Sequence, residues 1–179
     1  MKVEIRDIDD KTVKDIFASC KSCLYWEAPE RGEPKVPENK AIEIKQRWFK
    51  ETRDKFGSCG KLLYVDGQAA GYAQYAPPQF LENVAEFSRE LFPPSPDGIL
   101  LSCLHIKTEY QGKGLGTKLL QTVLEDLRER DYKIVETYSR DDSPVNSSGP
   151  TMLYQENGFR KLKTKKWGEG IFSLMRFDL

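Results

Sequence analysis

The sequence lacks the features that would place it in several special classes of protein. Lysine plus arginine equals aspartate plus glutamate, 28 residues of each kind, so no basic excess indicates binding to nucleic acid or to an anionic membrane. No stretch is apolar enough to span a bilayer, and the first ten residues, MKVEIRDIDD, are too charged for a signal peptide. We therefore expect a cytoplasmic protein that acts without a membrane or a nucleic acid.

Cysteine is scarce, and its spacing argues against a metal site. Two of the four cysteines, Cys20 and Cys23, form a C-x-x-C, but no second pair follows at the spacing of a zinc ribbon. A redox pair normally follows a strand, whereas this pair lies in a helical pattern that we expect to run from Asp9 and Asp10 to about Trp26. The apolar spacing predicts that both thiols face the core, with metal binding and redox chemistry as the alternatives.

What the sequence does contain is the composition of one ordinary globular domain. Its 179 residues are 39% apolar and 31% charged, which suits a single domain over residues 1–179. Asp66-Gly67 lies between two apolar runs and predicts a hairpin. Periodicity and breaker residues predict further strands at 3–8, 99–106, 132–139, 159–165 and 171–178, helices at 38–56, 117–130 and 149–159, and an insert at 79–98.

A glycine-rich segment, YQGKGLGT over residues 110–117, joins the apolar strand at 99–106 to an amphipathic helix. Glycines let a backbone come close to a ligand, and the N–H groups of a helix N-terminus favour a phosphate. The segment is not a P-loop, since Lys113 precedes the last glycine. It departs from a dinucleotide fingerprint because Thr117 stands where the third glycine belongs, although Glu136 could take the place of the ribose-binding acid. A turn without a ligand and a nucleotide-dependent oxidoreductase remain as alternatives.

Two motifs resemble those of a known family. Gln111-x-x-Gly114-x-Gly116 resembles the coenzyme A loop of the GCN5-related N-acetyltransferases (GNAT), and LY-x-x-x-GF over residues 153–159 resembles a second motif of that family. The order of expected elements matches the family over nearly the whole chain. The resemblance implies an α/β fold with a mixed sheet of about six to seven strands, flanked by helices and splayed after the central strand. It also implies an acetyl-CoA-dependent enzyme without a metal, which moves an acetyl group directly to a primary amine.

By the same resemblance, main-chain groups hold most of the cofactor. Leu104, His105 and Ile106 match the end of the central strand, where unpaired N–H and C=O groups bond the pantetheine arm. The N–H of Leu104 should polarise the thioester carbonyl. The residues that match the pyrophosphate loop are Gln111, Gly112, Lys113, Gly114, Leu115, Gly116 and Thr117.

Two side chains are candidates for proton transfer. Tyr154 matches a family tyrosine that often protonates the departing thiolate, and the alternative is a tyrosine packed in the core. Glu136 lies in an otherwise apolar strand and is the candidate base, against a carboxylate that points to solvent. His105 is the only histidine and the rival base, while Cys103 beside it is expected in the core.

The sequence departs from the family in the loop RDDSPVNSS, residues 140–148. Many members carry an asparagine seven residues before the tyrosine, where this chain has Ser147 and, one residue earlier, Asn146. We therefore assign that contact to neither residue. The loop also looks longer than usual and could contribute to the acceptor pocket.

The resemblance places acceptor specificity in residues 24–37 and 76–98. The aromatic and acidic residues there suit a cationic amine, or they pack the insert against the core, and they are Tyr25, Trp26, Glu27, Phe80, Phe87 and Phe92. The sequence does not separate a small-molecule amine from a protein amine, and it leaves a homodimer open. The main alternative function is a non-catalytic module that senses acyl-CoA, since that would need the glycine loop but neither Glu136 nor Tyr154.

Overall fold

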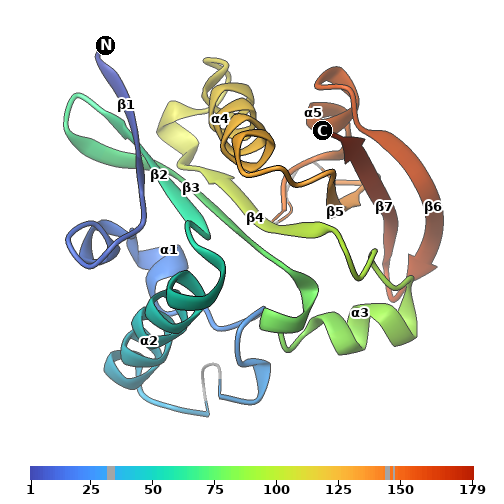
Figure 1. The fold of residues 1–179 in the computed structure, drawn as a ribbon, viewed down its shortest axis with the longest axis horizontal. Helices are drawn as coiled ribbons and strands as arrows, with labels where there is room; N and C mark the ends of the chain where they lie inside the picture. The colour runs from blue at the N-terminus through green and yellow to red at the C-terminus, as the bar shows by residue number, and fades with distance from the viewer. Residues whose placement is uncertain (32–34, 144–145, 147) are drawn as a thin grey trace.

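The computed structural model describes residues 1–31, 35–143, 146 and 148–179, and they form one seven-stranded sheet (Figure 1). The strands lie in the order β1-β2-β3-β4-β5-β7-β6. Five neighbouring pairs are antiparallel, and β4 and β5 are parallel, which confirms the mixed sheet. The strands are β1 Val3–Asp7, β2 Gly60–Val65, β3 Gln68–Ala76, β4 Ile99–Ile106, β5 Ile134–Arg140, β6 Arg160–Trp167 and β7 Gly170–Asp178.

Helices cover both faces of this sheet. On one face lie α4, Leu115–Glu129, and α5, Thr151–Glu156; on the other lie α1, Ala18–Lys21, α2, Glu38–Phe56, and α3, Val84–Glu90. Leu62 and Leu63, which are neighbours on β2, belong to the cores of different faces, as expected for side chains that alternate along a strand. Short 3-10 turns lie at Val13–Asp15, Pro29–Arg31, Pro78–Phe80 and Thr108–Tyr110.

Several local predictions are confirmed, each for a residue-level reason. Asp66 and Gly67 turn the chain between β2 and β3 with φ values of 48° and 84°, a left-handed pair that an aspartate and a glycine tolerate. α2 ends at Gly57, whose φ is 96°. The apolar stripe of α4 is buried as its periodicity predicts.

The predicted helix from Asp9 to about Trp26 is wrong. The Asp9 carboxylate accepts the N–H groups of Lys11 and Thr12, as a cap should, but it closes only a short turn. Ile16 and Phe17 then turn extended, with ψ values of 125° and 160°, so the α-helix is confined to α1. Because the helix is interrupted there, Cys20 and Cys23 do not both lie on the core-facing side that a continuous helix would give them.

The two thiols of the C-x-x-C therefore differ. Cys20 is partly buried, whereas Cys23 is exposed, so the prediction that both face the core is wrong for Cys23. Cys103 is not enclosed in the core as expected, because it is partly buried and lines a cavity. Within the described ranges, no group of three or more His, Cys, Asp or Glu side chains could hold a metal ion.

The buried face of α2 also differs from its apolar pattern. The sequence places Ile44, Trp48, Thr52 and Phe56 on one stripe, but the buried residues are Ala41, Lys45, Phe49 and Thr52. Lys45 is 2% exposed because its ammonium forms an ion pair with Glu27 inside the molecule. Because Lys45 is not apolar, the apolar pattern predicts Ile44 and Trp48 as buried in place of their neighbours Lys45 and Phe49.

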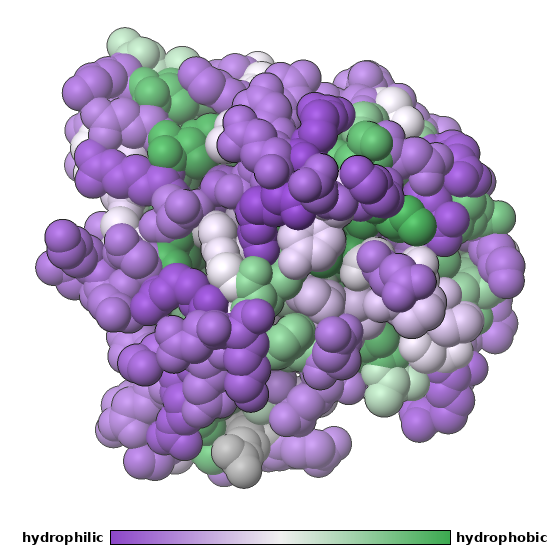
Figure 2. All heavy atoms as spheres, viewed as in Figure 1, coloured by the Kyte–Doolittle hydropathy of each residue, from purple (hydrophilic) through white to green (hydrophobic). Residues whose placement is uncertain are grey.

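The sheet opens between β4 and β5, which confirms the splay. These strands pair only at Ile99 with Val135 and at Leu100 with Glu136, and then separate. Figure 2 shows polar residues over most of the face seen in Figure 1, with apolar residues in small groups. A search of the described residues for a helix long and apolar enough to cross a membrane finds none.

Candidate active site

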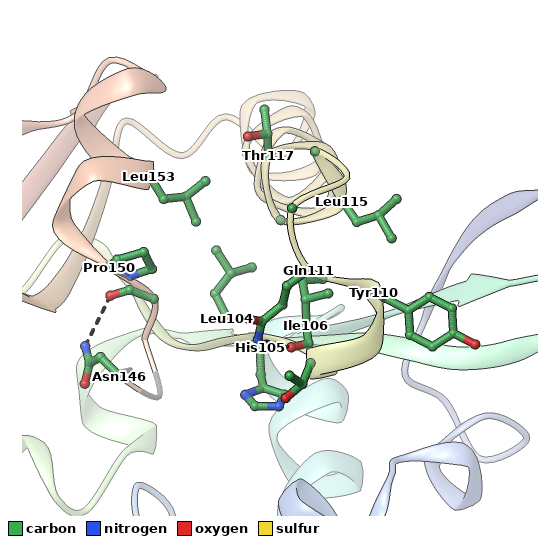
Figure 3. A pocket seen from close by; sticks show the side chains of 15 residues that line it. Leu104, His105, Ile106, Tyr110, Gln111, Leu115, Thr117, Asn146, Pro150 and Leu153 are labelled. Atoms are coloured by element: carbon green, nitrogen blue, oxygen red, sulfur yellow. Dashed lines mark hydrogen bonds between the residues drawn. The ribbon is translucent and has the colours of Figure 1, made fainter. Parts of the chain in front are cut away.

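A cavity of about 570 Å³ lies where β4 and β5 separate. Its walls are the end of β4, the glycine-rich segment, the first turn of α4 and the stretch from Gly149 to Leu153 (Figure 3). The Leu153 side chain extends toward the cavity from α5, and Asn146 donates to the carbonyl of Gly149 over 3.3 Å. We call this space the cofactor cavity.

One wall of the cofactor cavity is the edge of β4 beyond the two residues that pair with β5. The carbonyl of Ser102 accepts the Ser148 hydroxyl at 3.1 Å, and the carbonyl of Ile106 accepts the Gln111 amide at 2.8 Å. Main-chain groups point alternately to the two sides of a strand, so the N–H and C=O of Leu104 face the same open edge. This edge offers main-chain groups of the kind that a missing strand would bind.

The opposite wall is the N-terminus of α4. Gly112 and Gly114 have φ values of 71° and 72°, and an added Cβ at either position would meet nothing within 4 Å. Gly114 is the N-cap of α4, and the first turn contains no acidic residue. The N–H groups of a first helical turn have no partner within the helix, and the helix dipole favours negative charge there. The residues present therefore fit a phosphate.

The cofactor cavity brings together nearly all the residues predicted to hold coenzyme A. Lys113 is the exception, since its ammonium donates to the carbonyl of Glu109 over 3.1 Å instead of lining the cavity. The sequence analysis assigned no coenzyme A contact to the other lining residues, which are Thr108, Tyr110, Asn146, Gly149, Pro150 and Leu153. Ser147, which stands at the family's asparagine position, lies outside the described residues.

Tyr154 is buried behind the cofactor cavity and is not among its lining residues. Its hydroxyl donates to the carbonyl of Ser148, and its ring packs against Phe159 with centroids 5.1 Å apart. Burial raises the pKa of the phenol well above its usual value. The phenol therefore holds the stretch beside the cavity, and it reaches the cavity only if that stretch shifts.

Glu136 is also buried, with 1% of its surface exposed, so the alternative of an outward-pointing carboxylate is wrong. One oxygen accepts two N–H groups of Arg176, at 2.7 and 2.9 Å, and the other accepts the Ser95 N–H at 2.6 Å. This carboxylate ties β5 to β7 and to the insert. It is not among the residues that line the cofactor cavity.

His105 occupies a different position from the other candidates. Its ring points to the opposite side of β4 from the Leu104 side chain (Figure 3), and it lines both the cofactor cavity and a second, smaller cavity. Burial lowers the pKa of the imidazole below its usual value, which keeps the ring neutral at neutral pH. The ring of Phe17 lies 5.5 Å away, centroid to centroid.

The second cavity has a volume of about 120 Å³ and lies under α1 and α2. We call it the thiol pocket, and its lining residues are Ser19, Cys20, Cys23, Lys45, Tyr72, Cys103 and His105. Lys45 donates to the Glu27 carboxylate, to the Gln74 side chain at 3.0 Å and to the Cys23 carbonyl at 2.9 Å. Burial alone would lower the pKa of Lys45, but the Glu27 carboxylate outweighs it and raises the pKa.

The residues expected to attract a cationic acceptor are mostly committed to packing. Trp26 stacks on Tyr138 and contacts Phe87, with ring centroids 6.3 and 4.6 Å away. The Glu27 carboxylate is held by Lys45. Of the two readings for this region, packing of the insert against the core is the one that the structure supports, while Tyr25 remains 44% exposed.

Comparisons with known proteins agree with this arrangement. A profile of the acetyltransferase (GNAT) family matches residues 17–159. The fold is similar to an N-acetyltransferase from Staphylococcus aureus, with 17% identity, a TM-score of 0.64 and 99% of each chain covered. It is similar to the ribosomal-protein-alanine N-acetyltransferase from Brucella melitensis, with 21% identity, a TM-score of 0.64, and coverage of 98% of this chain and 99% of the other.

A third structure of similar fold contains the cofactor. It is the PaiA N-acetyltransferase from Thermoplasma acidophilum in complex with coenzyme A, with 15% identity, a TM-score of 0.61 and 100% of both chains covered. No curated protein matches the sequence. Because the family profile spans more than half of the chain, this protein belongs to the acetyltransferase (GNAT) family and is an acetyl-CoA-dependent N-acetyltransferase.

Proposed function

We propose that the chain binds acetyl-CoA in the cofactor cavity and transfers the acetyl group directly to a primary amine. One observation carries the proposal: the N-terminus of α4 and the unpaired edge of β4 open into the same cavity. A phosphate group and an extended amide chain are the two things that such walls bind. Acetyl-CoA contains both and supplies an activated acetyl thioester.

Each wall has its own role in this proposal. The segment from Gln111 to Thr117 holds the pyrophosphate, and the edge of β4 at Leu104, His105 and Ile106 holds the pantetheine arm. The Leu104 N–H donates to the thioester carbonyl and makes its carbon easier to attack. Because main-chain groups make these contacts, β4 needs no particular polar side chains to bind the pantetheine arm.

Acetyl transfer moves two protons besides the acetyl group. A carbon–nitrogen bond forms and a carbon–sulfur bond breaks, so the amine must lose a proton and the thiolate must gain one. Tyr154 remains the proposed acid, and the proximity of its hydroxyl to the wall of the cavity supports it. Glu136 and His105 are the two proposed bases, and position favours His105, which lines the cavity while Glu136 is held by Arg176.

Substitutions at these three positions test the roles. Tyr154→Phe should lower kcat by about 10²–10⁴ with little change in acetyl-CoA affinity, because the ring still packs and only the proton donor is lost. Loss of the base, through His105→Gln or Glu136→Gln, should be partly relieved at high pH, where more of the amine is neutral. Full turnover by all three variants would leave positioning by the β4 main chain as the source of catalysis.

The polar atoms of both Tyr154 and Glu136 are already bonded within the chain, so each group must exchange a partner before it can move a proton. A screen of amines with acetyl-CoA that follows thiol release measures the transfer. A thermal-shift comparison of coenzyme A with NAD tests the cofactor first, and a rise in melting temperature with NAD alone would contradict the proposal.

The class of acceptor also remains a proposal. The acceptor is a small-molecule amine or a protein amine, and the ribosomal-protein-alanine N-acetyltransferase of similar fold from Brucella melitensis supports including the second. The amine screen should therefore contain peptides with free N-termini as well as small amines.

A further inference from the structure

We propose that the thiol pocket is the acceptor subsite, and that it selects a small primary monoamine whose stem carries no charge. The inference rests on the proposed acetyl transfer and names the substrate class for that reaction.

The thiol pocket meets the cofactor cavity at His105. β3 and β4 pair Tyr72 with His105 and Gln74 with Cys103, so these side chains share the face of the sheet that lies under α1 and α2. His105 lines both spaces. An amine in the thiol pocket therefore approaches the open end of β4 from the face opposite the Leu104 side chain.

The thiol pocket also opens toward the surface. A shallower outer cavity of about 410 Å³ shares Ser19 and Cys23 with it, and the rest of its described lining is Ala18, Ser22, Leu24, Tyr25 and Pro29. Cys23 and Tyr25 are exposed. A stem attached to the amine can thus run from β4 past Cys23 to solvent, and the side chains named along this outer part carry no charge.

The size of the thiol pocket restricts the acceptor. At about 120 Å³ it is well below the roughly 300–1,000 Å³ of cavities that enclose a drug-sized ligand. It accommodates an amine at the end of a slim stem. The thiol pocket itself has no room for a bulky ring system next to β4.

The charges around the thiol pocket restrict the acceptor further. Lys45 is the one charged side chain in its described lining, and Glu27 already balances that charge. Burial raises the pKa of Cys20 to about 11 and that of Cys103 well above its usual value, so both thiols are neutral. An incoming ammonium therefore meets a cation and no free anion, which favours loss of its proton.

A second positive charge on the stem has no partner in this lining. Moving an unpaired charge out of water is costly, so a diamine should bind worse than a monoamine of equal length. A protein N-terminus followed by charged side chains should be excluded for the same reason. The acceptor is thus a monoamine with a slim, uncharged stem.

The experiment compares n-butylamine with 1,4-diaminobutane, which differ only in the second amine. We expect kcat/KM, followed by thiol release with acetyl-CoA, to be at least about tenfold higher for butylamine. Cys23→Glu places a carboxylate where the thiol pocket joins the outer cavity. It should shift the ratio of kcat/KM values toward the diamine by at least about tenfold. Cys23→Gln is the matched uncharged control and should leave the ratio as in the wild type.

Both variants should fold, because Cys23 is exposed, and both should bind coenzyme A with unchanged affinity. Equal or better use of the diamine by the wild type overturns the inference, as does an equal ratio for Cys23→Glu and Cys23→Gln. Acetylation of peptide N-termini in place of small monoamines also overturns it, while leaving the proposed acetyl transfer intact. If no amine releases thiol although coenzyme A binds, the proposed function fails and the inference fails with it.

Discussion

The cofactor cavity and the thiol pocket lie on either side of one residue, His105, but they are built in different ways. The first combines the edge of β4, the glycine-rich segment that follows it and the stretch from Gly149 to Leu153, and main-chain groups are its polar part at β4 and at the N-terminus of α4. The second consists of side chains from four separate segments, and a buried ion pair between Glu27 and Lys45 supports it. A binding site made of backbone depends on local conformation, whereas a site made of side chains depends on burial and charge.

The largest expected effect is the loss of stability on breaking the buried ion pair beside the thiol pocket. Lys45→Met leaves the Glu27 carboxylate buried without its partner, so the free energy of unfolding should fall by about 3–5 kcal/mol. Urea denaturation measures it. The double variant Glu27→Gln with Lys45→Met should recover most of the loss, because no buried charge remains. A loss no larger in the single variant than in the double variant would mean that the pair is not isolated from water.

Coenzyme A binding in the cofactor cavity should instead depend on the backbone conformation of the glycine-rich segment. Gly114→Val should weaken coenzyme A binding more than tenfold, about 1.4 kcal/mol or more, because valine disfavours a φ of 72° and its side chain enters the space beside the helix N-terminus. Calorimetric titration with coenzyme A measures the affinity.

The matched control for this prediction is Gly67→Val. Gly67 also has a positive φ, 84°, and open space around it, but it lies in the β2–β3 turn. This variant should lose stability and keep its coenzyme A affinity. An equal loss of affinity in both variants would attribute the effect to general destabilisation.

Substitution of the two cysteines of the C-x-x-C should have different effects on stability, because they differ in burial. Cys20→Ser should cost about 1 kcal/mol of unfolding free energy, since Cys20 is partly buried, and Cys23→Ser should change it by less than about 0.5 kcal/mol. Both variants should keep acetyl transfer, because neither thiol is a nucleophile in direct transfer. Denaturation curves and thiol-release rates test this, and stoichiometric zinc in the purified protein would contradict it.

The smallest expected effect concerns His105, where the two regions meet. Burial lowers the pKa of its imidazole, so below pH about 6.5 the unfolded chain binds a proton that the folded chain resists. Stability should therefore decrease as the pH falls through that range. His105→Gln should remove this contribution, which is small because the ring is only partly buried. Identical pH profiles of melting temperature for the two proteins would contradict the assignment.

Much of the fold and of the cofactor cavity follows from short stretches of sequence. The apolar run at 99–106, the alternating glycines and the periodic leucines of α4 each determine local structure, and together they place the edge of β4 beside a helix N-terminus. The turn at Asp66-Gly67 and the end of α2 at Gly57 follow from the conformational freedom of those residues.

Polar residues in the interior are what periodicity does not predict. Lys45 and Glu27 lie 18 residues apart and become core residues only because each neutralises the other. The same holds for Glu136, which the sequence leaves as either a base or a solvated carboxylate, and which Arg176 from β7 holds inside. Tyr154 is found in its expected element, but its hydroxyl partner, the carbonyl of Ser148, comes from the preceding loop.

By itself, the sequence determined the order of the strands and helices and the glycine-rich entry into α4 at residues 112–117, because hydrophobic period and glycine conformation act between near neighbours. Only the tertiary structure decided which polar groups are buried, that Cys23 is exposed, and that His105 lines both the cofactor cavity and the thiol pocket. The reason is physical: burying a charge is favourable only when its partner arrives from a distant segment, and that pairing exists only in the folded chain.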